Sequence, residues 1–481
     1  MTASFAAPLP PSIAFDRLGF FRWGRIAGKV LVTTDAGDWV LLGEPEFVQL
    51  LAGEITEGHP RYAELLAGGF LRDGLDLDAL AKRFSPRVAH VARGPERHVV
   101  TMTRRPEAVV DLDRETAERI IETALQSTSP TIAFDLQAHT GEPLLSFDGV
   151  KHFVEFARTT NERAAGKTLR FTLVSNLSAM TEETAEWLIA NDVALRTWLD
   201  GPAELHDANR AYTTAGAHAD VVRWIAWFDR RYRELGRAPE VWHVETRVTT
   251  TRRTLAAWRE VVDEYVARGL TSIDLRPLTP LGFDADAWKT VGYSADEYLE
   301  FYANAFAYVL DLNLRGTHLA EATASMFLNK ILSSGDPEAS GIRSPCAAGT
   351  SEFAYDVDGR VFPSDEARRL DAAGDPFFAL GDIRALALSD LVRHPTVRAI
   401  AAASLLDAQP MCADCWNKPF CGISPVTNYV REGDLFGQRP RCFECKEHMA
   451  VARTLFASLA DESDGAPKEI LQRWTRTARD R

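Results

Sequence analysis

The sequence predicts an α/β protein centred on a partial (β/α)6 barrel of the TIM type, with a small α+β domain before it and a cysteine-rich domain after it. Six short apolar segments alternate with amphipathic helical segments between residues 98 and about 285. All six cysteines lie after residue 345, in a segment rich in loops. Repeated βα units of this length favour a parallel sheet, and six units fit a partial barrel better than the complete eight.

The elements of the barrel follow from hydrophobic periodicity. Helices between the strands are predicted from apolar residues at helical spacing, and Asp113 and Thr181 are the expected N-cap residues of two of them. The strands are predicted at residues 98–102, 131–136, 169–174, 193–199, 242–249 and 272–275.

Changes of pattern predict the domain boundaries. Residues 1–12 are rich in Ala and Pro and are expected to form a flexible arm. In the small domain a hairpin, with turn residues at 35–38, precedes two short helices. The small domain is predicted to span residues 13–97, the barrel 98–335, the cysteine-rich domain 336–447 and a C-terminal helix 448–481.

Composition limits the partners that we expect. The chain has 481 residues, with 54 basic and 68 acidic side chains and a formal charge of −14. This balance provides no global basic field for nucleic acid or an anionic membrane. No apolar stretch reaches the length of a membrane helix, and the first residues do not resemble a signal peptide. We therefore predict a cytoplasmic protein that binds neither nucleic acid nor membrane.

Five of the cysteines have the spacing of metal ligands. Cys412, Cys415 and Cys421 are followed by the pair Cys442 and Cys445. In a reducing compartment such clusters indicate metal more often than disulfides, although buried or free thiols are the alternative. Two Cys-x2-Cys pairs would suit zinc, whereas the first three cysteines with Cys442 would suit an iron–sulfur cluster. The spacing alone leaves both metals open.

The C-terminal pattern resembles the SPASM domain of radical SAM peptide maturases. The resemblance rests on Cys346, on Asp358-Gly359 before Ser364, and on the cysteine run with Ser424. In that family two auxiliary [4Fe–4S] clusters are bound, and Ser364 and Ser424 stand where one of them has cysteine ligands. The resemblance implies that this cluster is lost. It implies that the other is held by Cys412, Cys415, Cys421 and Cys442, with Cys445 as the alternative fourth ligand.

The barrel sequence resembles the same family in altered form. Gly141-Glu142-Pro143 looks like the end of the Gly-Gly-Glu-Pro motif that contacts the SAM amino group, but His139 and its neighbours replace the first Gly. The whole chain most resembles the HxsB-type maturase of the His-Xaa-Ser peptide system. The implied SAM-site residues are Gly141, Glu142, Pro143, Asn176 and Asp200.

One departure from the family decides the functional hypothesis. Radical SAM enzymes carry Cys-x3-Cys-x2-Cys after the first strand, but this chain has no cysteine in residues 1–345. The short loop there holds Arg104 and Arg105 instead. Without that cluster SAM has no bonded electron donor, so binding of SAM is doubtful and reductive cleavage has no route. The sequence therefore predicts a non-catalytic pseudoenzyme of ribosomal peptide maturation.

The predicted partners are a precursor peptide, an active maturase, or both. The small N-terminal domain resembles, weakly, the peptide-recognition domain attached to many maturases, in which a leader peptide adds as a strand. A simple packing appendage is the alternative for this domain. Two other functions stay open: an active SAM- or cluster-using peptide-modifying enzyme, and a zinc-stabilised binding module.

Overall fold

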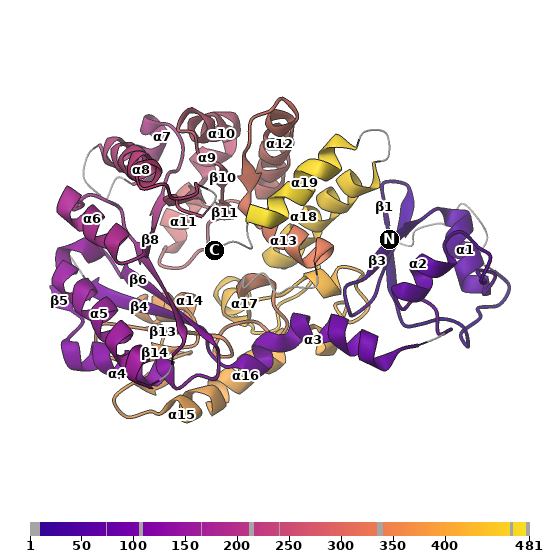
Figure 1. The fold of residues 1–481 in the computed structure, drawn as a ribbon, viewed down its shortest axis with the longest axis horizontal. Coiled ribbons are helices and arrows are strands. Elements are labelled where there is room, and N and C mark those ends of the chain that lie inside the picture. The colour runs from indigo at the N-terminus through magenta and orange to yellow at the C-terminus, as the bar shows by residue number, and fades with distance from the viewer. Residues whose placement is uncertain are drawn as a thin grey trace.

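The computed structural model describes most of the chain and shows a large α/β body with a small unit beside it (Figure 1). Of the predicted flexible arm only residues 10–12 are described, and Arg105 and residues 334–335 lie outside the described part. The described residues are 10–73, 75–104, 109–164, 166–210, 216–239, 241–333, 340–461 and 465–477.

Six parallel strands form the body of the ten-stranded main sheet. Each pairs in parallel with the next in chain order, which confirms the predicted partial barrel. The structure differs from the prediction in one detail, because Asp274 divides the last predicted strand into two short strands. The six are β4 (Arg97–Arg104), β6 (Thr131–Ala138), β7 (Thr168–Val174), β8 (Val193–Trp198), β9 (Glu245–Thr250) and β11 (Leu275–Pro277), beside the short β10 (Ser272–Ile273).

The C-terminal segment extends this sheet beyond β4, which the sequence analysis did not predict. Strand β13 (Glu352–Tyr355) pairs in parallel with β4, so that Glu352 lies opposite Arg97. Strand β14 (Arg360–Phe362) then forms a hairpin with β13, with Gly359 in its turn at φ 86°. A short strand, β15 (Gly381–Asp382), pairs with β14. The free edge of β4 is thus covered by strands from the opposite end of the chain.

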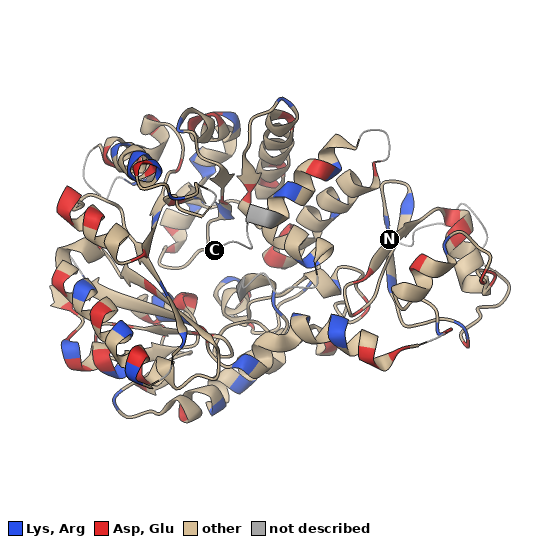
Figure 2. Cartoon of the chain, in the orientation of Figure 1, with Lys and Arg blue, Asp and Glu red and all other residues tan. Residues whose placement is uncertain are grey.

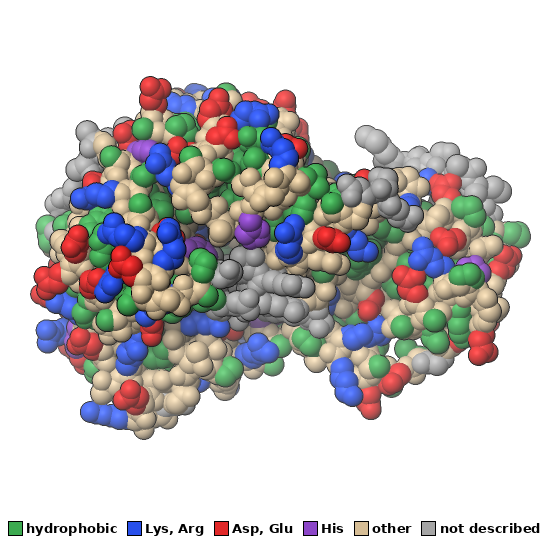
Figure 3. All heavy atoms as spheres, turned by 45° about the horizontal axis from the view of Figure 1, so that its top comes forward, with side chains coloured by type: hydrophobic (Ala, Val, Ile, Leu, Met, Phe, Trp, Pro, Cys, Tyr) green, Lys and Arg blue, Asp and Glu red, His purple; other side chains and the backbone are tan. Residues whose placement is uncertain are grey.

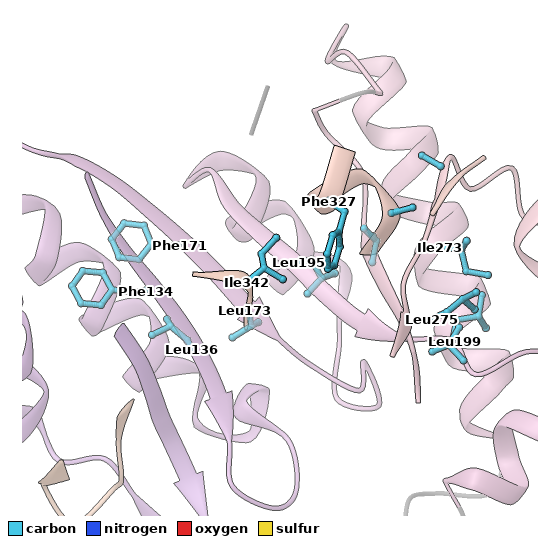
Figure 4. Packing of buried hydrophobic residues seen from close by; sticks show 14 of the residues in the cluster. Phe134, Leu136, Phe171, Leu173, Leu195, Leu199, Ile273, Leu275, Phe327 and Ile342 are labelled. Atoms are coloured by element: carbon cyan, nitrogen blue, oxygen red, sulfur yellow. The ribbon is translucent and has the colours of Figure 1, made fainter. Parts of the chain in front are cut away.

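Helices cover one face of the sheet and bury its apolar side chains. Alternate strand residues, such as Phe134 of β6 and Phe171 of β7, pack together with ring centroids 5.7 Å apart (Figure 4). Asp113 and Thr181 cap helices as predicted. The covering helices include α4 (Arg114–Leu125), α5 (Phe147–Ala164), α6 (Glu182–Ala190), α8 (Ala217–Glu234) and α10 (Trp258–Ala267), and α12 (Ala295–Leu314) and α13 (Ala322–Leu332) follow.

The N-terminal unit has a hydrophobic core of its own. It contains the predicted hairpin and two helices, together with a further strand and a long helix that the sequence analysis missed. Arg87 of the long helix donates hydrogen bonds to the carbonyls of Lys330 and Pro419, which ties this unit to the body. The elements are β1 (Arg22–Ile26), β2 (Lys29–Thr33), β3 (Trp39–Leu42), α1 (Glu44–Ala52), α2 (Tyr62–Ala67) and α3 (Leu77–Arg93).

The C-terminal part is mainly helical and ends in two helices where one was predicted. The first ends at Ala460 and the second begins at Ala466. No helix in the described part of the chain is both long and apolar enough to cross a membrane. The helices are α14 (Asp365–Ala372), α15 (Leu388–Arg393), α16 (Pro395–Ser404), α17 (Pro425–Glu432), α18 (Phe443–Ala460) and α19 (Ala466–Thr477).

Acidic and basic residues alternate over the outer helices of the body (Figure 2). The face that Figure 3 presents likewise mixes both signs of charge. This agrees with the absence of a broad basic field that the composition indicates.

Candidate site at the strand ends and cysteine cluster

The face of the sheet opposite α4 and α5 carries paired charges. Asp135 of β6 accepts a hydrogen bond from Arg97 of β4 at 2.5 Å and from Arg196 of β8 at 3.1 Å. Glu352 completes the row, 3.3 Å from Arg97. Burial opposes ionisation of Asp135, but the two arginines outweigh it and hold the pKa of Asp135 well below its ordinary value. This inner face therefore carries charged side chains from four strands, and each of these four side chains has an oppositely charged partner.

Helix α14 lies against this inner face and reaches the carboxyl end of β6. Ala367 packs with Val99 of β4 and Ala354 of β13. Asp365 accepts a hydrogen bond from Gln137 Nε2 at 2.6 Å and from its own helix neighbour Arg368. A helix of the C-terminal segment thus covers the end of the second barrel strand.

His139, the residue that replaces the first Gly of the family motif, is held by the same helix. Arg368 Nη1 donates to His139 Nδ1 at 2.9 Å, and Arg368 is almost fully buried. Burial and the adjacent Arg368 lower the pKa of His139, so the ring is neutral and its nitrogen accepts the bond. The altered motif residue therefore has a structural partner inside the protein.

The end of the first barrel strand is held in a similar way. Arg104, at the end of β4, forms an ion pair with Asp356, at the end of β13, and Asp356 is fully buried. Asp358 of the hairpin turn lies 3.9 Å from the same guanidinium. The carboxyl end of β4 is thus held to the end of β13 and to the hairpin turn by an arginine–carboxylate pair.

Glu142 joins two strand ends rather than facing open space. Its carboxylate accepts hydrogen bonds from Ser175 Oγ and the Asn176 amide, both at 2.7 Å, and from the Leu144 amide at 3.2 Å. The preceding Gly141 permits the turn, with φ at 90°. Burial raises the pKa of Glu142 to about 7, although the three bonds act against this. The structure thus brings Glu142, Pro143 and Asn176 together.

Asp200 belongs to a separate arrangement at the end of β8. It is fully buried and accepts hydrogen bonds from Arg210 Nε at 2.9 Å and from the Thr249 amide at 2.8 Å. No hydrogen bond joins Asp200 to Glu142 or Asn176 in the described part of the chain. Both carboxylates, Glu142 and Asp200, therefore have hydrogen-bond partners within the protein.

A hollow that the sequence analysis missed opens next to α17. It has a volume of about 460 Å³ and is lined by Phe283, Leu370 and Tyr429, among others. Tyr429 stacks on the half-exposed Phe377 with ring centroids 4.7 Å apart. No periodic or motif signal in the sequence brings these distant residues together.

The clustered cysteines lie in two segments that face each other. Cys412, Cys415 and Cys421 surround a short 3-10 turn, η4 (Lys418–Phe420), whereas Cys442 and Cys445 lie at the start of α18. All six cysteines are free thiols. In the described residues no three His, Cys, Asp or Glu side chains converge closely enough to hold a metal ion as they stand.

The donor chemistry of this cluster fits a metal. Burial raises the thiol pKa values, that of Cys421 well above its ordinary range and that of Cys445 to about 12. The thiols are therefore protonated in the metal-free protein, and a metal would have to displace their protons. Several thiols at this spacing are the donor set of zinc or iron–sulfur sites.

The two serines at expected cysteine positions are helix N-caps. Ser364 caps α14 by accepting a hydrogen bond from the Ala367 amide, and Ser424 caps α17 in the same manner. Cys346 is buried against Val99 and Ala354. The positions at which the resemblance leads us to expect ligands of a second auxiliary cluster hold two helix caps and one buried cysteine.

Solved structures share this fold at low sequence identity. The structure of anSMEcpe with bound AdoMet matches with a TM-score of 0.61 and 15% identity, over 79% of this chain and 100% of that one. The same protein with AdoMet and Cp18Cys peptide matches with a TM-score of 0.60 and 16% identity, over 76% and 99%. SuiB of Streptococcus suis bound to S-adenosylmethionine matches with a TM-score of 0.50 and 14% identity, over 89% and 98%.

These matches establish the fold class. No family model matches the sequence, and no curated protein matches it either. The chain has the mixed α/β architecture of radical SAM/SPASM peptide maturases, with a partial barrel, a small N-terminal antiparallel sheet and a C-terminal cysteine cluster, which confirms the predicted fold class. The closer likeness to HxsB-type maturases stays a prediction.

The raised pKa of Glu142 predicts a pH-dependent contribution to stability. A carboxyl whose pKa rises on folding favours the folded state at low pH, and this contribution is lost as pH rises through about 7. Glu142→Gln should therefore reduce the loss of unfolding free energy between pH 5.5 and 8.5, by up to about 2 kcal/mol. Denaturant unfolding at the two pH values measures this.

The matched control is Glu155→Gln, at an exposed position of α5. It should leave the pH dependence of the wild-type protein unchanged. An equal pH dependence for Glu142→Gln and the wild type would contradict the assignment.

Proposed function

We propose that the chain is a non-catalytic relative of the radical SAM/SPASM peptide maturases that binds a precursor peptide or a partner maturase. The observation that carries the proposal is the absence of cysteine from residues 1–345, which includes the loop after β4. A cluster that donates an electron to SAM needs thiolates at that loop, and none is available from the barrel.

The contacts at the strand ends support this proposal. Arg104 is held by Asp356, and His139 is held by Arg368. Glu142 is surrounded by donors from the protein itself. A ligand at this position would have to break buried ion pairs and hydrogen bonds. Breaking them would leave buried polar and charged groups without partners, which costs free energy. The binding free energy of SAM at the site that the family motif predicts is therefore expected to be small.

One retained metal site completes the proposal. Cys412, Cys415 and Cys421 would supply three thiolates, and the start of α18 would supply a fourth. A [4Fe–4S] cluster is the expected occupant by resemblance, and zinc is the alternative. Either would crosslink two segments and add folding free energy to the C-terminal domain.

The proposed place for a peptide is the N-terminal sheet. Its strand order is β1-β2-β3, so β1 and β3 are its edges. An added peptide strand gains affinity from main-chain hydrogen bonds along such an edge. The solved structure of anSMEcpe with Cp18Cys peptide supports a peptide ligand for this fold.

The proposal predicts that the purified protein does not cleave SAM. Anaerobic protein, loaded with iron and sulfide, is incubated with SAM and dithionite, and 5′-deoxyadenosine is quantified by mass spectrometry. The expected result is no product above the protein-free background. An active radical SAM enzyme run in parallel shows that the reductant works. Repeated turnover by the chain would contradict the proposal and favour the active-enzyme alternative.

The proposal also predicts where a precursor peptide binds. Hydrogen exchange of the full chain is compared with and without a synthetic precursor peptide encoded beside its gene. The edge strand that pairs with the peptide, β1 or β3, should gain protection, because main-chain hydrogen bonds to an added strand slow the exchange of amides. Unchanged exchange in both edges, with protection elsewhere, would exclude this binding mode.

A further inference from the structure

We propose that the hollow beside α17 binds an aromatic side chain of the precursor peptide, at a point where the peptide carries an arginine or lysine next to that side chain. The inference rests on the proposed function, because it identifies the kind of peptide segment that the protein recognises. The hollow is a place in the fold other than the N-terminal sheet and the cysteine cluster.

The hollow lies where the last barrel strand meets the C-terminal segment. One wall is the loop 280–283, which follows the carboxyl end of β11. Helices α14 and α17 form other parts of the lining with Leu370 and Tyr429. Ligands of barrel proteins bind at this end of the strands. A volume of about 460 Å³ lies within the range of small-molecule pockets, so a large side chain can enter.

Hydrogen bonds hold the walls of the hollow in place. Tyr293 Oη accepts a hydrogen bond from the Leu278 amide at 2.6 Å, and Arg431 of α17 donates to the Leu278 carbonyl oxygen at 3.0 Å. On the other side Tyr429 Oη donates to Asp375 Oδ2 at 2.9 Å. A ligand therefore does not have to order these side chains, which lowers the entropic cost of binding.

Aromatic surface is left exposed at and beside the hollow. The Phe377 ring stacks on Tyr429 with ring centroids 4.7 Å apart and an interplanar angle of 4°, and Phe377 is 53% exposed. Phe283, in the loop wall, is 38% exposed. A ring bound here would remove part of this surface from water and would contact other rings, and both effects are favourable. The lining therefore favours an aromatic residue of the peptide.

The charges around the hollow favour a cation beside that ring. Asp375 is the one residue of the lining with a charged side chain. Among the sequence neighbours of the lining residues, the exposed charged side chains are three acidic ones and Arg369. The acidic ones are Asp284, Glu432 and Asp434. A basic residue of the peptide would be attracted by this excess of negative charge, and its cation could also lie against an exposed ring.

Ligand-observed NMR with capped dipeptides tests the assignment in the full-length protein. The probes are N-acetyl-phenylalanyl-arginine amide, its glutamate analogue N-acetyl-phenylalanyl-glutamate amide, and N-acetyl-glycyl-arginine amide. Ala373→Trp places an indole in the hollow, and Ala372→Trp is the matched control at an exposed position outside the lining. Asp375→Asn removes the charge but keeps an acceptor for the Tyr429 hydroxyl. Circular dichroism establishes that each variant is folded.

We expect the wild type to bind the phenylalanyl-arginine probe about fivefold more tightly than the phenylalanyl-glutamate probe. The glycyl-arginine probe should bind about tenfold more weakly than the phenylalanyl-arginine probe, because it has no ring to bury. Ala373→Trp should weaken binding of the phenylalanyl-arginine probe by a similar factor, whereas Ala372→Trp should not change it. Asp375→Asn should reduce the preference for arginine over glutamate to about twofold.

Equal binding of the arginine and glutamate probes, or unchanged binding by Ala373→Trp, would overturn the assignment. The precursor peptide, measured with the same variants, separates this inference from the proposed function. A precursor peptide that binds the wild type and Ala373→Trp equally would overturn the role of the hollow and leave the proposed function standing. Binding of the phenylalanyl-arginine probe without any binding of the precursor peptide would instead contradict the proposed peptide ligand.

Discussion

The pairing of charges on the inner face of the sheet is the constraint on which the rest of the structure depends. Asp135 lies between Arg97 and Arg196, and Arg97 also faces Glu352. A buried ion costs several kcal/mol unless a partner and hydrogen bonds compensate it. Arg97, on β4, has a partner from β13, because Glu352 lies 255 residues further along the chain. The C-terminal segment is therefore built into the barrel itself.

This integration accounts for the residues that depart from the family pattern. Arg104 and His139 stand where the resemblance leads us to expect a cysteine loop and a glycine, and both are bonded to the C-terminal hairpin or to α14. Ser364, at an expected cysteine position, caps that same helix. Arg104, His139 and Ser364 thus belong to one set of contacts between the barrel and the C-terminal segment.

Local sequence patterns predicted the helices and strands, whereas the arrangement of the site depends on contacts between residues far apart in the sequence. The six barrel strands and the caps Asp113 and Thr181 follow from periodicity and short-range hydrogen bonds, so the sequence alone indicated them. The pairing of β13 with β4, and the bond of Gln137 to Asp365 across 228 residues, leave no local signal.

The central claim is that the strand ends no longer form a SAM site. Equilibrium dialysis of the full-length, metal-loaded protein against labelled SAM tests it most directly. The account predicts no saturable binding up to about 1 mM, where binding free energy falls to about −4 kcal/mol. Saturable binding of one SAM per chain with a Kd in the micromolar range would contradict it.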